Sequence, residues 1–153
     1  YIVVFDHLVW NQKFLARYLV SNNDFLDASS AKFLLKILKI CKKLNLKLIL
    51  KTKRKQWYLK KYHNFLKKLQ ENNFDNFDIL FDKSVYEVSI KSQLCITFPF
   101  TSAAIMAKNY GMPSIYFDHN SKYKNNSKDL NYGIKTIFGE VELFNYLLKY
   151  KTK

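Results

Sequence analysis

The stretch Leu94–Asp118 reads LCITFPFTSAAIMAKNYGMPSIYFD and decides the fold. Its first apolar run ends at Phe98, and a proline turn with the pair Thr101-Ser102 then opens a run of small residues. A glycine and a proline end this helical run, and a second apolar run leads to Asp118. The pattern predicts a strand, a helix and a second strand in succession, as in the repeating unit of a parallel sheet.

The rest of the chain alternates strand-like and helix-like patterns in the same way. The strands are predicted at Ile2–Phe5, Leu46–Leu50, Phe77–Phe81, Leu94–Phe98, Ser114–Phe117 and Gly133–Phe138. The helices are predicted at Gln12–Leu19, Ala31–Leu44, Trp57–Gln70, Ser84–Lys91, Ser102–Tyr110 and Glu140–Tyr150. Ser29 and Ser30 are candidate N-caps of the second helix, Asn45 is expected to end it, and Ser84 with Glu87 has the spacing of a capping box. The chain is therefore expected to be an α/β domain with a mainly parallel sheet of about six strands.

Composition indicates one globular domain over residues 1–153. A hydrophobic content of 48% excludes a disordered chain, and no apolar run approaches the roughly 20 residues of a membrane-spanning helix. The chain opens on Tyr1 and leads straight into a strand without a signal peptide, which favours a fragment of a cytoplasmic protein. Cys41 and Cys95 are expected to be buried thiols in a reducing compartment.

The formal net charge of +14 allows three anionic partners: nucleic acid, a membrane surface or a substrate. A basic helix over Lys55–Lys68 also carries aromatic residues, which could stack on single-stranded nucleic acid. At helical spacing, however, such aromatics more often pack against a sheet, so nucleic acid is the weaker interpretation. The chain is also rich in Lys, Asn, Phe, Tyr and Ile, so AT-rich coding is an equally good explanation of the charge.

The predicted strand ends bring chemically useful residues to one edge, where open parallel sheets bind ligands. The residues there are Asp6, His7, Lys51, Lys53, Arg54, Pro99, Phe100, Thr101, Ser102, Asp118 and His119. Free N–H groups at the start of a helix, with the hydroxyls of Thr101 and Ser102, suit a phosphate oxygen. The alternative is that either hydroxyl is only an N-cap, that the cations form a solvated turn, and that each Asp-His pair is a turn.

Several kinds of site are missing from the sequence. The three histidines are scattered, with no Cys or His at the spacing of metal ligands, so no metal site is predicted. The chain has no nucleophile elbow, no Walker-type loop and no dinucleotide fingerprint. Either Asp-His pair could serve in acid–base chemistry, but no catalytic residue is assigned.

The Leu94–Asp118 segment, with P-F-T-S and then G-M-P-S-I-Y-F-D, resembles the C-terminal half of GT-B-type bacterial glycosyltransferases of surface polysaccharide biosynthesis. The stretch LNLKLILKTKR resembles the strand and basic turn of that family, and NYGIKTIFGEVELFNYL resembles its closing strand and helix. The resemblance covers roughly Ser29 to Tyr150.

This resemblance implies a three-layer Rossmann-like domain that binds a nucleotide-sugar donor without a metal or another cofactor. Pro99, Phe100, Thr101 and Ser102 would hold the donor phosphate, with Lys51, Lys53 and Arg54 as neutralising cations. Asp6, His7, Asp118 and His119 would lie near the sugar or ribose.

The resemblance also implies partners. A missing N-terminal half-domain would complete the enzyme, the acceptor would be a glycan or a lipid-linked sugar, and the chain could lie against the anionic inner membrane. The alternatives are an epimerase-like nucleotide-sugar domain, a basic nucleic-acid-binding module and a non-catalytic α/β interaction domain.

Overall fold

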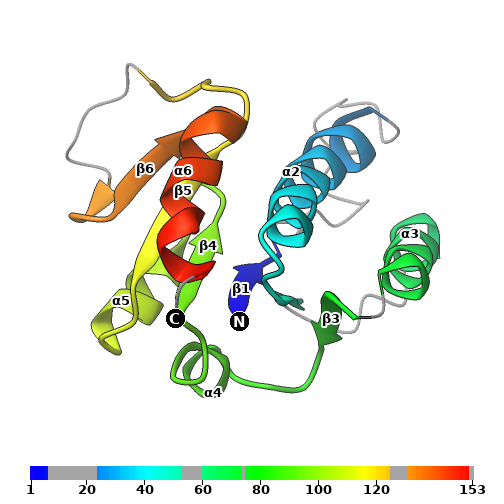
Figure 1. The fold of residues 1–153 in the computed structure, drawn as a ribbon, viewed down its shortest axis with the longest axis horizontal. Helices are drawn as coiled ribbons and strands as arrows, with labels where there is room; N and C mark the ends of the chain where they lie inside the picture. The colour runs from blue at the N-terminus through cyan, green and yellow to red at the C-terminus, as the bar shows by residue number, and fades with distance from the viewer. Residues whose placement is uncertain (7–23, 53–59, 74, 125–130, 152–153) are drawn as a thin grey trace, which may run out of the picture.

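The computed structural model describes residues 1–6, 24–52, 60–73, 75–124 and 131–151 (Figure 1). In this part of the chain six strands form one sheet in the order β3-β2-β1-β4-β5-β6, and every neighbouring pair is parallel. The strands are β1 (Ile2–Phe5), β2 (Leu48–Lys51), β3 (Phe77–Leu80), β4 (Leu94–Thr97), β5 (Ser114–Asp118) and β6 (Lys135–Phe138). The prediction of a three-layer Rossmann-like α/β domain is confirmed, and the sheet is wholly parallel.

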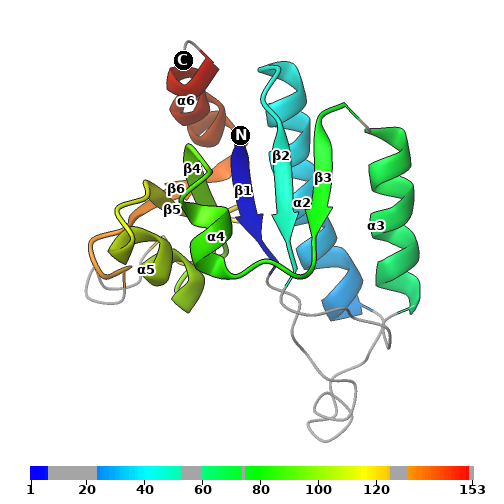
Figure 2. The ribbon, with the colours of Figure 1, turned by 90° about the horizontal axis from the view of Figure 1, so that it is seen from below.

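Helices cover both faces of the sheet (Figure 2). One face packs against α2 (Asp24–Lys43), α3 (Lys60–Asn72) and α6 (Gly139–Lys151). The other face packs against α4 (Val85–Ser89) and α5 (Ser102–Asn109). Because both faces are covered, every residue of the inner strands β1, β2 and β4 is buried, as is usual for parallel sheets.

The ends of two helices were predicted from single residues, and both predictions are confirmed. Asn45 adopts a left-handed backbone with φ 55°, and the N–H of Leu46 donates to the carbonyl of Cys41 at 2.8 Å. Gly111, which follows α5, also adopts a left-handed backbone, with φ 78°. These are Schellman-type endings, in which a left-handed residue turns the chain away from the helix axis.

One helix start was predicted wrongly. α2 begins at Asp24, so Ser29 and Ser30 lie inside the helix and are not its N-cap. Serine is only a moderately poor helix former, and no proline or glycine precedes the pair to stop the helix from extending. The predicted helix at Gln12–Leu19 and the first residues of the helix predicted at Trp57–Gln70 lie outside the described residues.

The strand bounds agree with the prediction to within one residue except at β2 and β6. β2 runs from Leu48 to Lys51, so Lys51 is the last residue of a buried strand and does not begin a solvated turn. β6 begins at Lys135, after a turn in which Gly133 has a positive φ. Cys41 and Cys95 are both buried free thiols, as predicted.

Candidate functional site

The P-F-T-S turn lies at the point where the strand order reverses. β1 pairs with β2 on one side and with β4 on the other, and the turn follows directly after β4. In open α/β sheets this switch point is where ligands bind, since connections leave neighbouring strands toward opposite faces. Thr101 and Ser102 are therefore at the carboxyl edge of the sheet, in its middle.

The backbone of the turn leaves the start of α5 without a side-chain cap. Thr101 is the N-cap residue, with φ −86° and ψ 142°, but its hydroxyl donates to the carbonyl of Phe98 at 3.1 Å and makes no capping bond. The hydroxyl of Thr97 donates to the same carbonyl, also at 3.1 Å. The first N–H groups of a helix have no acceptor within the helix, so an anion is a suitable acceptor for those of α5.

Phe100 gives the turn its shape. Its φ is 63°, a left-handed backbone that non-glycine residues seldom adopt. Its ring packs edge-on against Tyr116, with centroids 5.7 Å apart, and against Tyr123 at 5.5 Å. These ring contacts hold the strained residue, because they anchor the turn to β5 and to the segment after it.

Asp118 ties that segment to the turn. The Asp118 carboxylate is 1% exposed, and its Oδ2 accepts a hydrogen bond from the backbone N–H of Tyr123 at 2.7 Å. Tyr123 in turn contacts Phe98 as well as Phe100. The structure thus brings Asp118 and the P-F-T-S turn together, with one carboxylate oxygen engaged in positioning the segment.

His119 is buried beside the turn with its hydrogen-bonding capacity unused. It is 4% exposed and lies among the rings of Phe33, Phe98 and Phe117, with centroids 5.9, 6.2 and 6.3 Å away. Neither Nδ1 nor Nε2 has a hydrogen-bond partner among the described residues. A buried polar group without a partner requires an explanation, and a ligand group is one.

The charge state of His119 follows from its surroundings. Burial is the main cause that lowers its pKa, and the ammonium of Lys36 lowers it further, although Asp118 opposes this. Lys36 lies on α2, and its Nζ donates to the backbone carbonyl of His119 at 3.0 Å. A neutral imidazole offers one donor and one acceptor, which suits a hydroxyl group of a ligand.

The Lys51 side chain links the carboxyl ends of β2 and β3. It is 7% exposed, and its Nζ donates to the carbonyls of Thr52 and Phe81, the second at 3.3 Å. Burial lowers the pKa of Lys51, while the carboxylates of Asp82 and Asp6 favour its charged form. Asp6 follows β1, and its N–H donates to the carbonyl of Lys51 at 2.9 Å. Lys51 and Asp6 therefore lie together at the ends of β1, β2 and β3, with two of the three ammonium protons on carbonyls.

Three of the predicted site residues, His7, Lys53 and Arg54, lie outside the described part of the chain. Sequence reasoning missed Phe33, Lys36 and Tyr123. Phe33 and Lys36 have the spacing that puts two residues on one helix face, but no local pattern indicated that this face meets His119. Within the described residues, no group of three or more His, Cys, Asp or Glu side chains could hold a metal ion.

The model of one protein family, described as polysaccharide biosynthesis PFTS motif protein, matches residues 1–147. The chain belongs to this family. The four letters of the motif occur once in the sequence, as Pro99-Phe100-Thr101-Ser102. In this chain those four letters form the turn at the switch point of the sheet, and membership of the family connects the chain to polysaccharide biosynthesis.

A search among curated proteins finds no match to the chain. In the part of the chain that the structure describes, no helix combines the length and the apolar character needed to cross a bilayer.

Proposed function

We propose that this PFTS family member binds a nucleotide-sugar donor and acts as the donor-binding half of a GT-B-type glycosyltransferase in surface polysaccharide synthesis. One observation carries the proposal: the family's motif forms an uncapped helix start at the switch point of a Rossmann-like sheet. The ring nitrogens of buried His119 have no partner among the described residues, and its ring contacts the ring of Phe98, the residue directly before this turn.

The donor phosphate is assigned to the start of α5. In glycosyl transfer the bond between the anomeric carbon and the phosphate oxygen breaks, and the nucleoside phosphate leaves with that electron pair. The negative charge that develops there is stabilised by the free N–H groups of α5 and by the helix dipole. The Ser102 hydroxyl, which is exposed, adds a further donor. No metal or other cofactor has a role in this proposal.

The sugar or ribose is assigned to the ends of β1 and β5. The neutral imidazole of His119 can both donate to and accept from a hydroxyl group. Lys36 donates to the backbone carbonyl of His119 and supplies positive charge beside it. The predicted cations Lys51, Lys53 and Arg54 are assigned to the donor phosphate, although Lys51 Nζ has only one proton beyond its two carbonyl bonds. We assign the acceptor, a glycan or a lipid-linked sugar, and the catalytic base to the N-terminal half-domain that the resemblance implies.

Isothermal titration calorimetry with CMP, UDP and GDP and with their sugars tests the proposal. At least one of them is expected to bind, and the double variant Thr101→Val, Ser102→Ala is expected to weaken that ligand tenfold or more, since the loss of even one hydrogen bond to a charged group costs ~1.5–3 kcal/mol. His119→Phe keeps the aromatic packing and is expected to weaken only ligands that carry a sugar or ribose hydroxyl near the ring.

Ser84→Ala is the matched control, because it removes an N-cap hydroxyl from α4, on which no part of the proposed site lies. It is expected to leave ligand affinity unchanged. If no nucleotide or nucleotide sugar binds at millimolar concentration, or if the double variant and the control behave alike, the proposed donor site is wrong.

A further inference from the structure

A groove lies between α2 and α6 on the outer surface of the molecule. Figure 1 shows the two helices side by side on one face of the sheet, where they contact each other. The groove has a volume of about 300 Å³, and its lining residues are Lys39, Ile40 and Lys43 of α2 with Glu140, Val141 and Phe144 of α6. We call it the α2–α6 groove, and no residue assigned to the donor site lines it.

One wall of the groove is apolar. Ile40 is buried beneath it, Phe144 is half-buried, and Val141 is 77% exposed, more than any other large apolar side chain in the described part of the chain. Leu148, also exposed, extends this wall, because Val141, Phe144 and Leu148 have the spacing of one helix face. An apolar surface of this kind, rimmed by polar residues, is typical of a site that another molecule covers.

The other wall is basic. Lys36, Lys39 and Lys43 occur at positions i, i+3 and i+7 of α2, so they form one row along that helix. Lys36 is engaged, since its Nζ lies 3.6 Å from Oε1 of Glu140 and donates to a backbone carbonyl. Lys39 and Lys43 are exposed, and neither has a hydrogen bond or an ion pair among the described residues. Because Glu140, the acid of the groove, is paired with Lys36, two positive charges of the groove stay unpaired.

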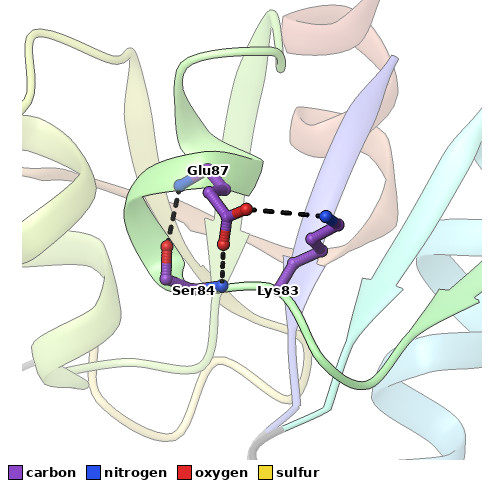
Figure 3. A network of polar contacts seen from close by, with 3 residues as sticks. All are labelled: Lys83, Ser84 and Glu87. Carbon is purple, nitrogen blue, oxygen red and sulfur yellow. Dashed lines mark hydrogen bonds and ion pairs between the residues drawn. The ribbon is translucent and has the colours of Figure 1, made fainter.

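An exposed lysine attracts a partner most strongly when its charge is not neutralised within the chain. Figure 3 shows the opposite case, Lys83, whose ammonium lies 3.5 Å from the carboxylate of Glu87; this carboxylate also accepts from the Ser84 N–H at 2.8 Å. Lys108 is likewise engaged, since it donates to the carbonyl of Tyr132 at 2.8 Å. The two free lysines of the α2–α6 groove differ from both, and their charge is available to an anionic partner.

A helix with acidic residues beside an apolar stripe is the complement of this groove. The groove runs between two helices whose lining residues recur every three to four positions, and a third helix packs onto such a pair by placing its own ridge of side chains between them. The row from Lys36 to Lys43 spans seven residues, which is ~10 Å or two helical turns. An extended segment would instead pair with a free sheet edge, and a proline-rich segment requires a groove lined by aromatic rings.

Three other occupants fit less well. The residues outside the described part hold a single acid, Asp129, so they supply no acidic helix face. A two-fold contact with a second copy would bring both lysine rows into one interface, where they repel each other. A nucleic acid would meet the apolar wall only with charged phosphates. We propose that the α2–α6 groove binds an acidic amphipathic helix of a partner protein.

The site of this contact differs from the proposed donor site. Lys43 ends α2, and the chain then enters β2 at Leu48, so the basic end of the groove lies at the amino edge of the sheet. The P-F-T-S turn lies at the opposite, carboxyl edge. A partner helix in the groove therefore leaves the donor site open, and this partner is distinct from a half-domain that would face that site.

Fluorescence anisotropy with two labelled peptides of about 18 residues tests the proposal. Both peptides carry leucine at positions i, i+3, i+4 and i+7, flanked by glutamate in one and by lysine in the other. The glutamate peptide is expected to bind, less tightly as salt is raised, and the lysine peptide is not. Lys39→Glu, Lys43→Glu is expected to weaken the glutamate peptide about tenfold and to strengthen the lysine peptide, because two attractive charges become repulsive. Val141→Ser is expected to weaken the glutamate peptide about fivefold.

Lys67→Glu, Lys68→Glu is the matched control, because it changes the net charge by the same amount at exposed positions of α3. It is expected to bind the glutamate peptide like the original chain, and circular dichroism checks that each variant is folded. The proposal is overturned if the glutamate peptide does not bind, if the control and the groove variant weaken it equally, or if a single-stranded oligonucleotide of equal charge binds more tightly and depends on the same lysines. No nucleotide sugar is required, so the outcome is independent of the donor site.

Discussion

Substitution of Phe100 by glycine is expected to be milder than substitution by alanine, the reverse of the usual order. Both variants lose the ring contacts with Tyr116 and Tyr123, and truncating a phenylalanine to alanine costs about 3 kcal/mol of unfolding free energy. Alanine keeps a left-handed backbone at φ 63°, which costs an L-residue roughly 1–2 kcal/mol.

Glycine removes that strain but gains more conformational freedom in the unfolded chain, worth roughly 0.5–1 kcal/mol. Phe100→Gly should therefore be more stable than Phe100→Ala by about 0.5–1 kcal/mol. For a chain of this size the difference corresponds to about 2 °C in melting temperature.

Urea unfolding followed by circular dichroism measures both variants. Phe144 is the control, since it is also half-buried but lies inside α6, where glycine costs about 1 kcal/mol relative to alanine. Phe144→Gly should therefore be less stable than Phe144→Ala. If the two positions show the same order, the left-handed conformation assigned to the P-F-T-S turn is wrong.

Three further predictions concern buried polar groups. Lys51→Met should lower the unfolding free energy by about 1–3 kcal/mol in urea melts, because two carbonyls lose their donor, whereas Lys67→Met on exposed α3 should change it little. The pKa of His119 in the folded chain lies below its unfolded value of 6.5, so the contribution of His119 to stability is present above pH 6.5 and is lost as the pH falls below 6.5. The urea midpoint should therefore fall as the pH is lowered from 6.5. His119→Phe should make this fall smaller. Cys41 and Cys95 should resist a thiol reagent in the folded chain and both react in urea, since burial raises the pKa of each thiol, to about 12 for Cys41; rapid labelling of the folded chain would contradict their burial.

The strand–helix–strand unit at Leu94–Asp118 was predictable because local signals agree. The proline after β4 and Gly111 after α5 place the turns, and the small residues of α5 fit against the sheet. Parallel pairing followed from the alternation of strands and helices along the whole chain. The start of α2 was not predictable in this way, because serine is compatible both with an N-cap and with a helix interior.

The position of the candidate residues at the strand ends was predictable, but their contacts were not. Local sequence placed Thr101, Ser102, Asp118 and His119 at strand ends, and these are at the carboxyl edge. The aromatic surroundings of His119 depend on Phe33, which lies far away in the sequence on α2. The burial of Lys51 depends on where β2 ends, and an error of one residue turns a buried strand position into a solvated turn.

The central position of β1 has a consequence for folding during synthesis. Among the six described strands, β1, β2 and β3 are made before the other three, so half of the sheet can assemble early. The other side of β1 stays open until β4 emerges, after α2, β2, α3, β3 and α4 have been made. An unpaired edge of Ile2, Val3 and Val4 is an aggregation-prone surface for that interval. We therefore expect yields of this chain to depend on translation speed and on chaperones that bind extended apolar segments.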